Sequence, residues 1–299
     1  MKKAFLILLI LFSVNAIHAQ KDTVWRKGGL IALNFSQVSL TNWAAGGQNS
    51  IAGNSIINYF ANYKRGKNAW DNYLDLGYGL VLQGKDSRMV KSDDRIDLSS
   101  KYGRQASRNW YYSALFNFRS QFTAGYNYPN DSVVISKFLS PGYVLLSPGM
   151  DYKPNAHFSL FLSPATLRFV IVADKLLSAA GAYGVHPGKT IKTEAGAFLR
   201  AVFKKDLSPV LNLQSSLDLF SNYLHNPQNI DINWQTLFLL KVSKYISASL
   251  SLQVLYDDDT KITFYKNDGT TVDHIGPGTQ FKEAIGIGFA YKFSAVTVK

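Results

Sequence analysis

Cysteine is absent from the 299-residue chain. This absence excludes disulfide bonds, thiolate metal sites and the lipid-modified N-terminus that requires a cysteine at the cleavage point. Acidic residues are also few, because 20 Asp and Glu stand against 32 Lys and Arg, a formal net charge of +12. A basic balance can indicate a nucleic-acid partner, but we expect none because an exported protein rarely meets nucleic acid, and attraction to anionic lipid headgroups or anionic solutes fits better. The basic residues are also scattered, as on an ordinary positive surface.

Long hydrophobic runs are missing after the N-terminus. Lys2 and Lys3 precede a short apolar segment, residues 4–14, and the small residue Ala19. This pattern predicts a cleaved secretory signal peptide over residues 1–19 and a single mature domain over residues 20–299. An N-terminal membrane anchor is the alternative, but the apolar segment is shorter than the roughly 20 residues that a spanning helix needs. Loss of Lys2 and Lys3 lowers the formal charge from +12 to +10.

Apolar residues are nevertheless abundant, at 46% hydrophobic and 14% aromatic, and they alternate with small or polar residues. One face of segment 280–293 carries Phe281, Ile285, Ile287, Phe289, Tyr291 and Phe293. The other face carries mainly Lys, Ala and Gly. A period of two is the signature of a strand with one apolar face, and strands in a membrane β-barrel alternate in this way between lipid and lumen.

The alternation predicts an all-β fold, a transmembrane antiparallel up-and-down barrel of about twelve strands. We expect the strands near residues 29–40, 50–63, 70–81, 93–102, 110–122, 141–152, 158–166, 191–203, 210–221, 232–242, 246–256 and 280–293. Pro141, Pro148 and Pro164 interrupt two of them, and proline cannot donate to a strand ladder. Short connections alternate with long ones, as periplasmic turns alternate with external loops. Both termini then lie on the periplasmic side.

A soluble β-sandwich or soluble barrel would also alternate. Three features favour the membrane barrel, the first being strands longer than the usual 5–6 residues. The second is a set of aromatic residues near strand ends, as in interfacial girdles: Trp43, Tyr59, Tyr63, Trp70, Tyr102, Trp110, Tyr111, Tyr112, Tyr256 and Tyr291. The third is the terminal segment Gly288–Phe293, which matches the Gly-x-x-aromatic-x-aromatic pattern read by the barrel insertion machinery. We therefore expect that machinery, through Tyr291 and Phe293, and outer-membrane lipid as partners.

Several segments are distinctive. They are Trp25–Leu30 leading into Leu33–Gly47, Trp70–Gly79, Gly125–Asn130 and Asn222–Asp231. These segments resemble an uncharacterised group of exported Bacteroidetes proteins, domain-of-unknown-function family 3078. The resemblance extends over nearly all of the mature chain. It implies an outer-membrane location and carries over no activity and no functional residue.

Residues able to carry chemistry are sparse, and we predict no catalytic, metal or cofactor site. His157, His186, His225 and His274 fall in predicted turns or loops, without metal-ligand spacing. Asp257–Asp259 could bind Ca²⁺ through carboxylate oxygens, but no EF-hand loop surrounds them. Ser221 and His225 could belong to an outer-membrane hydrolase, but no motif supplies the third group that orients the base. An enzyme is the weaker alternative.

Charged residues of both signs fall on the predicted lumen face. The candidates are Asp71, Asp75, Arg95, Asp97, Lys101, Arg119, Glu194, Arg200, Asp218, Lys241 and Lys282, with Lys292 on the same face. They can line a pore or cross-link to fill it, and near twelve strands the interior is narrow enough to be filled. We expect a channel, transporter or binding barrel for a small solute or lipid. A structural or interaction barrel acting through external loops is the alternative, and the oligomeric state stays open.

Overall fold

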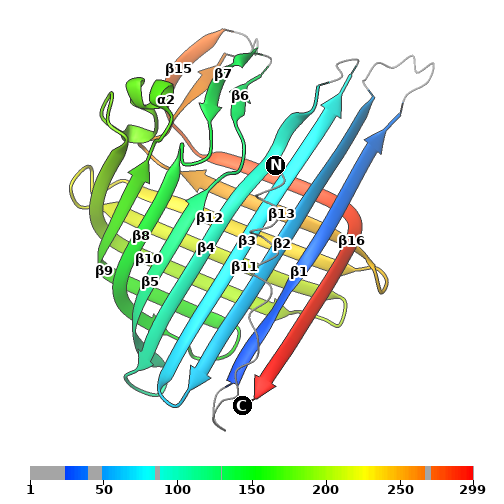
Figure 1. Cartoon of the computed structure of the whole chain (residues 1–299), viewed down its shortest axis with the longest axis vertical. Coiled ribbons are helices and arrows are strands. Elements are labelled where there is room, and N and C mark those ends of the chain that lie inside the picture. The colour runs from blue at the N-terminus through cyan, green and yellow to red at the C-terminus, as the bar shows by residue number, and fades with distance from the viewer. Residues whose placement is uncertain (1–23, 40–48, 85–87, 129, 267–270, 299) are drawn as a thin grey trace, which may run out of the picture.

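The computed structural model describes residues 24–39, 49–84, 88–128, 130–266 and 271–298. The predicted signal peptide and Trp43 lie outside these residues. Twelve antiparallel strands close into one barrel in the order β1-β16-β13-β12-β11-β10-β9-β8-β5-β4-β3-β2 (Figure 1). Consecutive barrel strands are neighbours throughout, which confirms the predicted all-β, up-and-down, twelve-stranded fold. None of the helices in the described ranges is long and apolar enough to cross a membrane.

The barrel strands are β1 (Val24–Val38), β2 (Ser50–Arg65), β3 (Asn68–Gln83), β4 (Val90–Gln105), β5 (Trp110–Ser120), β8 (Gly142–Tyr152), β9 (Phe158–Ile171), β10 (Ile191–Asp206), β11 (Leu211–Asn222), β12 (Ile230–Lys241), β13 (Ile246–Tyr256) and β16 (Gln280–Val298). The short turns, such as the one between β2 and β3, lie at the end of the barrel where β1 begins and β16 ends (Figure 1). We call this the turn end and the opposite one the loop end.

The closing strands are longer than the sequence pattern predicted. Residues 29–40 and 280–293 were expected, whereas β1 begins at Val24 and β16 continues to Val298. The extensions pair with each other, from Val24 opposite Val298 to Gly28 opposite Ser294. Within each terminal segment, apolar and polar residues do not alternate regularly. In the first segment, Arg26, Lys27 and the two glycines interrupt the alternation. Their mutual ladder supplies the hydrogen bonds that make them strands.

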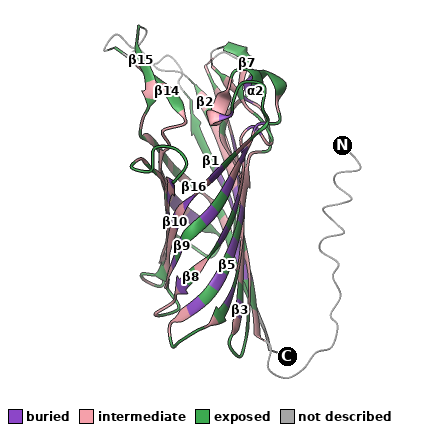
Figure 2. Ribbon diagram, turned by 90° about the vertical axis from the view of Figure 1, so that its left-hand side faces the viewer, coloured by how far each residue is buried: buried purple, intermediate pink, exposed green. Residues whose placement is uncertain are grey.

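The outer face of the barrel is apolar and exposed. Buried and exposed residues alternate along β5 and its neighbours (Figure 2). On β16 the outward side chains of Phe281, Ile285, Ile287, Phe289 and Tyr291 are each at least 61% exposed. Trp70, Tyr102 and Tyr112 are exposed near the turn end of adjacent strands. A largely apolar outer wall of this extent is rare on soluble monomers.

Prolines interrupt the ladder between β8 and β9 without ending either strand. Their pairing runs to Leu146 opposite Leu167 and resumes at Met150 opposite Leu162. Pro164 and Ala165 both face outward, so a bulge reverses the alternation and places Thr166, Arg168 and Val170 inside. The predicted end of this strand at residue 166 was therefore wrong, because a constant period of two does not follow a chain through a bulge.

Two long connections contain structure that the alternation did not predict. β6 (Gly125–Asn127) pairs with β7 (Asn130–Ser136), and β14 (Lys261–Tyr265) pairs with β15 (Val272–Pro277). A third connection holds α2 (Lys175–Ala179) and η1 (Ala182–Gly184). Asp174 caps α2 by accepting the backbone N–H groups of Leu176 and Leu177, and these hydrogen bonds lower the pKa of its carboxyl. All these elements stand beyond the barrel at the loop end (Figure 1).

Candidate functional site: the barrel interior

The half of the interior nearer the loops contains a cavity of about 450 Å³, which we call the outer cup. Its wall carries charged side chains from many strands, among them Asp94, Arg95, Asp97, Arg119, Arg168, Asp218, Asp231 and Asp257. Tyr183 of η1 and Thr260 lie at its rim on the loop side. The size falls in the range of about 300–1,000 Å³ that is typical of small-molecule sites.

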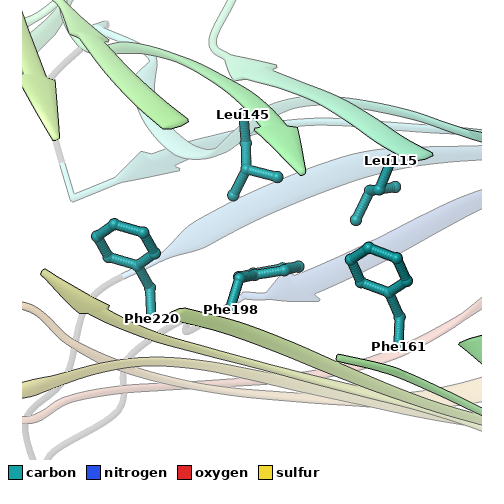
Figure 3. Packing of buried hydrophobic residues seen from close by; sticks show 5 residues of the cluster. All are labelled: Leu115, Leu145, Phe161, Phe198 and Phe220. Carbon is teal, nitrogen blue, oxygen red and sulfur yellow. The ribbon is translucent and has the colours of Figure 1, made fainter. Parts of the chain in front are cut away.

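An apolar cluster lies at the bottom of the outer cup. It consists of Leu115, Leu145, Phe161, Phe198 and Phe220, each at most 4% exposed. Figure 3 shows these side chains converging from both sides on one space. Leu145, Phe198 and Phe220 also line the cup, whereas Leu115 and Phe161 do not. The cluster therefore forms the floor of the cup and continues inward from it.

A buried ion pair joins the neighbouring strands β10 and β11 at the level of the cluster, and its arginine also reaches across the interior. Arg200 on β10 donates from Nε and Nη2 to the two carboxylate oxygens of Asp218, both at 2.6 Å. Its Nη1 donates to Ser99 Oγ on β4 at 2.7 Å. Because β9, β8 and β5 separate β10 from β4 in the barrel order, this hydrogen bond bridges the lumen. A bidentate pair of this kind is among the strongest and most specific polar contacts.

A second charged network lies on the turn-end side of the cluster. Lys101 pairs with Asp151 at 2.8 Å and donates to Ser159. Lys153, in the turn after β8, pairs with both Asp151 and Asp71. The ammonium of Lys204 on β10 lies 4.1 Å from the ring centre of Tyr73 on β3. The strands β3, β4, β8, β9 and β10 are thus held together across the interior below the cup.

The wall formed by β1, β16 and β13 carries several small, buried side chains on its inner face. Ala32 is 2% exposed, and Ser247 and Ser249 are 7% and 8% exposed. Small side chains facing a wide, water-filled lumen would be accessible to solvent. Further along β13 toward the loops, the inward-facing Ser251, Gln253 and Leu255 are partly exposed. The interior therefore narrows from the cup toward the turn end.

Most lumen candidates predicted from sequence take part in these contacts. Asp75 pairs with Arg95 at 3.2 Å, and Asp97 accepts a hydrogen bond from Asn117 at 2.6 Å. Glu194 pairs with Arg168 and with Lys192. Arg119 stacks over Tyr143 and has no acidic partner within the described chain. Asp71, Lys101, Arg200 and Asp218 belong to the two networks above.

Three predicted positions lie away from the narrow part of the barrel. Lys241 is exposed at the turn end of β12. Lys292 pairs with Asp206 across the turn end at 3.3 Å, with both side chains more than 60% exposed. Lys282 pairs with Asp93 on β4 near the loops, with a side chain 42% exposed.

Sequence reasoning missed Arg168, Asp231 and Asp151. Arg168 pairs with both Glu194 and Asp231 and lies 4.1 Å from the ring centre of Phe220. It was placed in a loop because the bulge at Pro164 reverses the alternation. Asp231 was missed because the strand was predicted to begin at residue 232, whereas β12 begins at Ile230. Asp151 faces inward on β8, where Pro148 obscured the pattern. The proline at position 164 was the one available sign in the sequence that the alternation of inward and outward residues could reverse there.

Carboxylates gather at the loop side of the cup. Oxygens of Asp231, Asp257 and Asp258 lie within 4.8 Å of one another. Asp231 pairs with Arg168, and Asp258 accepts a hydrogen bond from Asn229 at 2.8 Å. Burial raises the pKa of the Asp257 carboxyl above its usual range. Calcium binding by residues 257–259 stays a prediction.

The residues considered for a hydrolase are engaged elsewhere. Ser221 Oγ donates to the carbonyl of Pro227 at 2.6 Å, and the His225 ring contacts Asn226. Across the described ranges, Ser221 and His225 form no hydrogen bond with each other. Hydrolysis stays a prediction of the sequence.

Comparison with known proteins yields a family model and distant structural neighbours. Residues 35–126 match the model described as "Protein of unknown function (DUF3078)", less than half of the chain. No curated protein sequence matches. An outer membrane channel from Pseudomonas putida F1 is similar at 11% identity and a TM-score of 0.36, over 94% of this chain and 98% of that one.

The translocator domain of the autotransporter NalP from Neisseria meningitidis is similar at 10% identity and a TM-score of 0.35, over 98% of this chain and 94% of that one. The NanC porin is similar at 7% identity and a TM-score of 0.35, over 88% of this chain and 98% of that one. At such scores the role of this chain has to be argued from its own residues.

Proposed function

We propose that the protein is a bacterial outer-membrane barrel that receives a small solute in the outer cup and has no continuous open pore. The apolar outer wall supports a membrane location, because lipid is the solvent that such a surface requires. The predicted signal peptide supports export, and the resemblance noted in the sequence would place the protein in the Bacteroidetes. After membrane fractionation, the protein should resist carbonate extraction, whereas recovery as a soluble periplasmic protein would refute the location.

The observation that carries the cup proposal is the change in the interior along the barrel. The loop half holds a cavity lined by charged and amide groups, whereas the turn half is filled by the apolar cluster and by contacts that join opposite walls. A cavity closed on one side suits capture of a solute better than its free passage. Passage would require the floor to move.

The chain lacks cysteine, so single cysteines can report on access from each side. Gln253 lines the cup, whereas Gln214 faces inward on β11 nearer the turn end. In intact cells, a maleimide too large to cross the outer membrane should label Gln253→Cys and leave Gln214→Cys unlabelled until the membrane is broken. Absence of labelling at position 253 would refute an outward-facing cup, and equal labelling at both positions would refute the closed floor.

Recognition by the barrel insertion machinery is a second part of the proposal. Tyr291 and Phe293 lie within β16, whose strand continues to Val298, and their rings stack 6.2 Å apart. We expect the double variant Tyr291→Ser, Phe293→Ser to be exported but to accumulate without heat-modifiable folded protein. Normal levels of the folded form would exclude this role.

A second candidate function is partner binding through the loop-end elements. Leu176 on α2 is 80% exposed and Ile275 on β15 is 63% exposed, so both stand free of the barrel. If these residues bind a partner, the variant Leu176→Ser, Ile275→Ser should lose crosslinked complexes in intact cells while keeping its folded level. Unchanged crosslinking would remove this candidate.

A further inference from the structure

The charged groups of the outer cup are mostly satisfied within the barrel. Asp218 is held by Arg200, and Asp231 by Arg168. Arg95 pairs with Asp75. Asp94 accepts the backbone N–H groups of Phe122 and Thr123 and pairs with Lys91. These contacts leave little capacity to bind an added charged group.

Arg119 is the exception among the cup arginines in the described part of the chain. Among the described residues Arg119 forms no ion pair, and its buried Nε atom has no hydrogen-bond partner. The Nε atom of Arg95 also makes no hydrogen bond, but it lies 3.2 Å from a carboxylate oxygen of Asp75. Its guanidinium carbon lies 5.6 Å from the ring centre of Tyr143, which holds it against the wall. Asp97 stands opposite it in the strand register but accepts a hydrogen bond from Asn117 instead. Arg119 lines the cup without a counter-ion, and an anionic ligand in the cup would supply one.

The surroundings of Arg119 restrict the charge and shape of such a ligand. Five carboxylates line the same cavity, those of Asp94, Asp97, Asp218, Asp231 and Asp257. A ligand with two or more negative charges would be repelled by this wall. The floor formed by Leu145, Phe198 and Phe220 is apolar. A single planar anionic group attached to an apolar body suits both features.

We propose that the outer cup binds a carboxylate-bearing solute, with the carboxylate on Arg119 and an apolar portion on Phe198 and Phe220. This inference rests on the proposed capture function and names its ligand class. Planar carboxylates match the fork of N–H groups on a guanidinium. A simple monocarboxylate and an amino acid share this chemistry, and the acidic groups near Asp257 would favour the amino acid by attracting its ammonium.

Calorimetric titration of the folded full-length chain in detergent micelles tests the proposal, with heats from empty micelles subtracted and EDTA present. The probes are 3-phenylpropionate, its neutral amide 3-phenylpropionamide, and L-phenylalanine. We expect 3-phenylpropionate to bind at least about tenfold more tightly than the amide, because a hydrogen-bonded charge contributes about 10–100-fold in affinity. Tighter binding of L-phenylalanine than of 3-phenylpropionate would identify the amino acid as the source of the carboxylate, and the reverse would identify a simple monocarboxylate.

Arg119→Gln should abolish the preference for the carboxylate over the amide, whereas Arg119→Lys should keep part of it. Arg104→Gln is the matched control, because Arg104 is exposed at the turn end of β4 and far from the cup. Equal binding of acid and amide to the wild type, an unchanged preference in Arg119→Gln, or no binding of any probe would overturn the proposal. The proposed function is judged separately, because labelling of Gln253→Cys from outside reports an open cup whether or not a carboxylate binds.

Discussion

The two halves of the barrel interior differ in how completely their charged residues are paired. At and below the floor of the cup, the charges of Arg200, Asp218, Lys101 and Asp151 are buried and paired, and Arg200 and Lys101 also contact strands that are not their neighbours. Toward the loops, the charges of Arg119 and Asp257 lie on a cavity wall and lack an ion-pair partner in the described chain. Most inward charges, including most of those in the cup, therefore pair within the barrel, and the cup differs in also holding charges without an ion-pair partner, which are available for binding.

The strongest way to break this comparison is to remove a charge from the lower half. Arg200→Ala leaves Asp218, which is 8% exposed, without its counterion. Loss of one partner of a buried pair costs about 3–5 kcal/mol, so we expect a drop of that size in the free energy of unfolding, measured by denaturant titration in micelles. The variant Arg200→Met, Asp218→Leu should recover most of the loss, because it leaves no unpaired charge.

Lys292→Ala provides a control for Arg200→Ala. Lys292 also pairs across the lumen, but its side chain and that of Asp206 are more than 60% exposed. Exposed pairs contribute about 0–1 kcal/mol. An equal loss in Lys292→Ala and Arg200→Ala would show that burial does not distinguish the two pairs.

A smaller effect is expected when the inner and outer faces are exchanged on one strand. Leu250 faces outward on β13, and Ser251 faces the interior below Gln253. An arginine facing lipid at mid-membrane costs about 2–4 kcal/mol, whereas the partly exposed inner face at position 251 tolerates a charge better. Leu250→Arg should therefore destabilise the folded barrel in lipid by that amount relative to Ser251→Arg. The opposite order would mean that the faces are assigned in the wrong register.

The barrel could be predicted because alternation is a local property of each strand. β13 begins and ends at the predicted residues 246 and 256, since its large and small residues alternate without interruption. The cup and its floor could not be predicted in the same way. Whether Arg200 reaches Ser99, or Arg119 reaches no carboxylate, depends on the register and tilt of strands far apart in the sequence.

Arg168 shows where the local pattern fails. It follows a proline bulge, so a constant period assigns it to a loop, although it pairs with Glu194 and Asp231 in the wall of the cup. The sequence predicted only which charged residues face the lumen. Which of these residues form ion pairs and which do not is known only from the three-dimensional structure.

The smallest effect on stability is expected in the cup itself. Arg119→Gln removes a charge that has no acidic partner and breaks only the cation–π contact with Tyr143, so the free energy of unfolding should fall by only about 0.5–1 kcal/mol. The same denaturant titration measures it. A loss as large as that of Arg200→Ala would show that Arg119 pairs with a carboxylate such as Asp97 in solution, and the distinction between the two halves would fail.

The ionic conductance of the purified protein in planar lipid bilayers tests the closed floor most directly. We predict that the wild type inserts without a steady open-channel current, because the apolar cluster and the Arg200–Ser99 bridge fill the interior below the cup. The variant Phe161→Ala, Phe198→Ala, Phe220→Ala should conduct, which also shows that insertion has occurred. A steady, ohmic current through the wild type at low voltage would contradict the account, because it would require a continuous water-filled path past these residues.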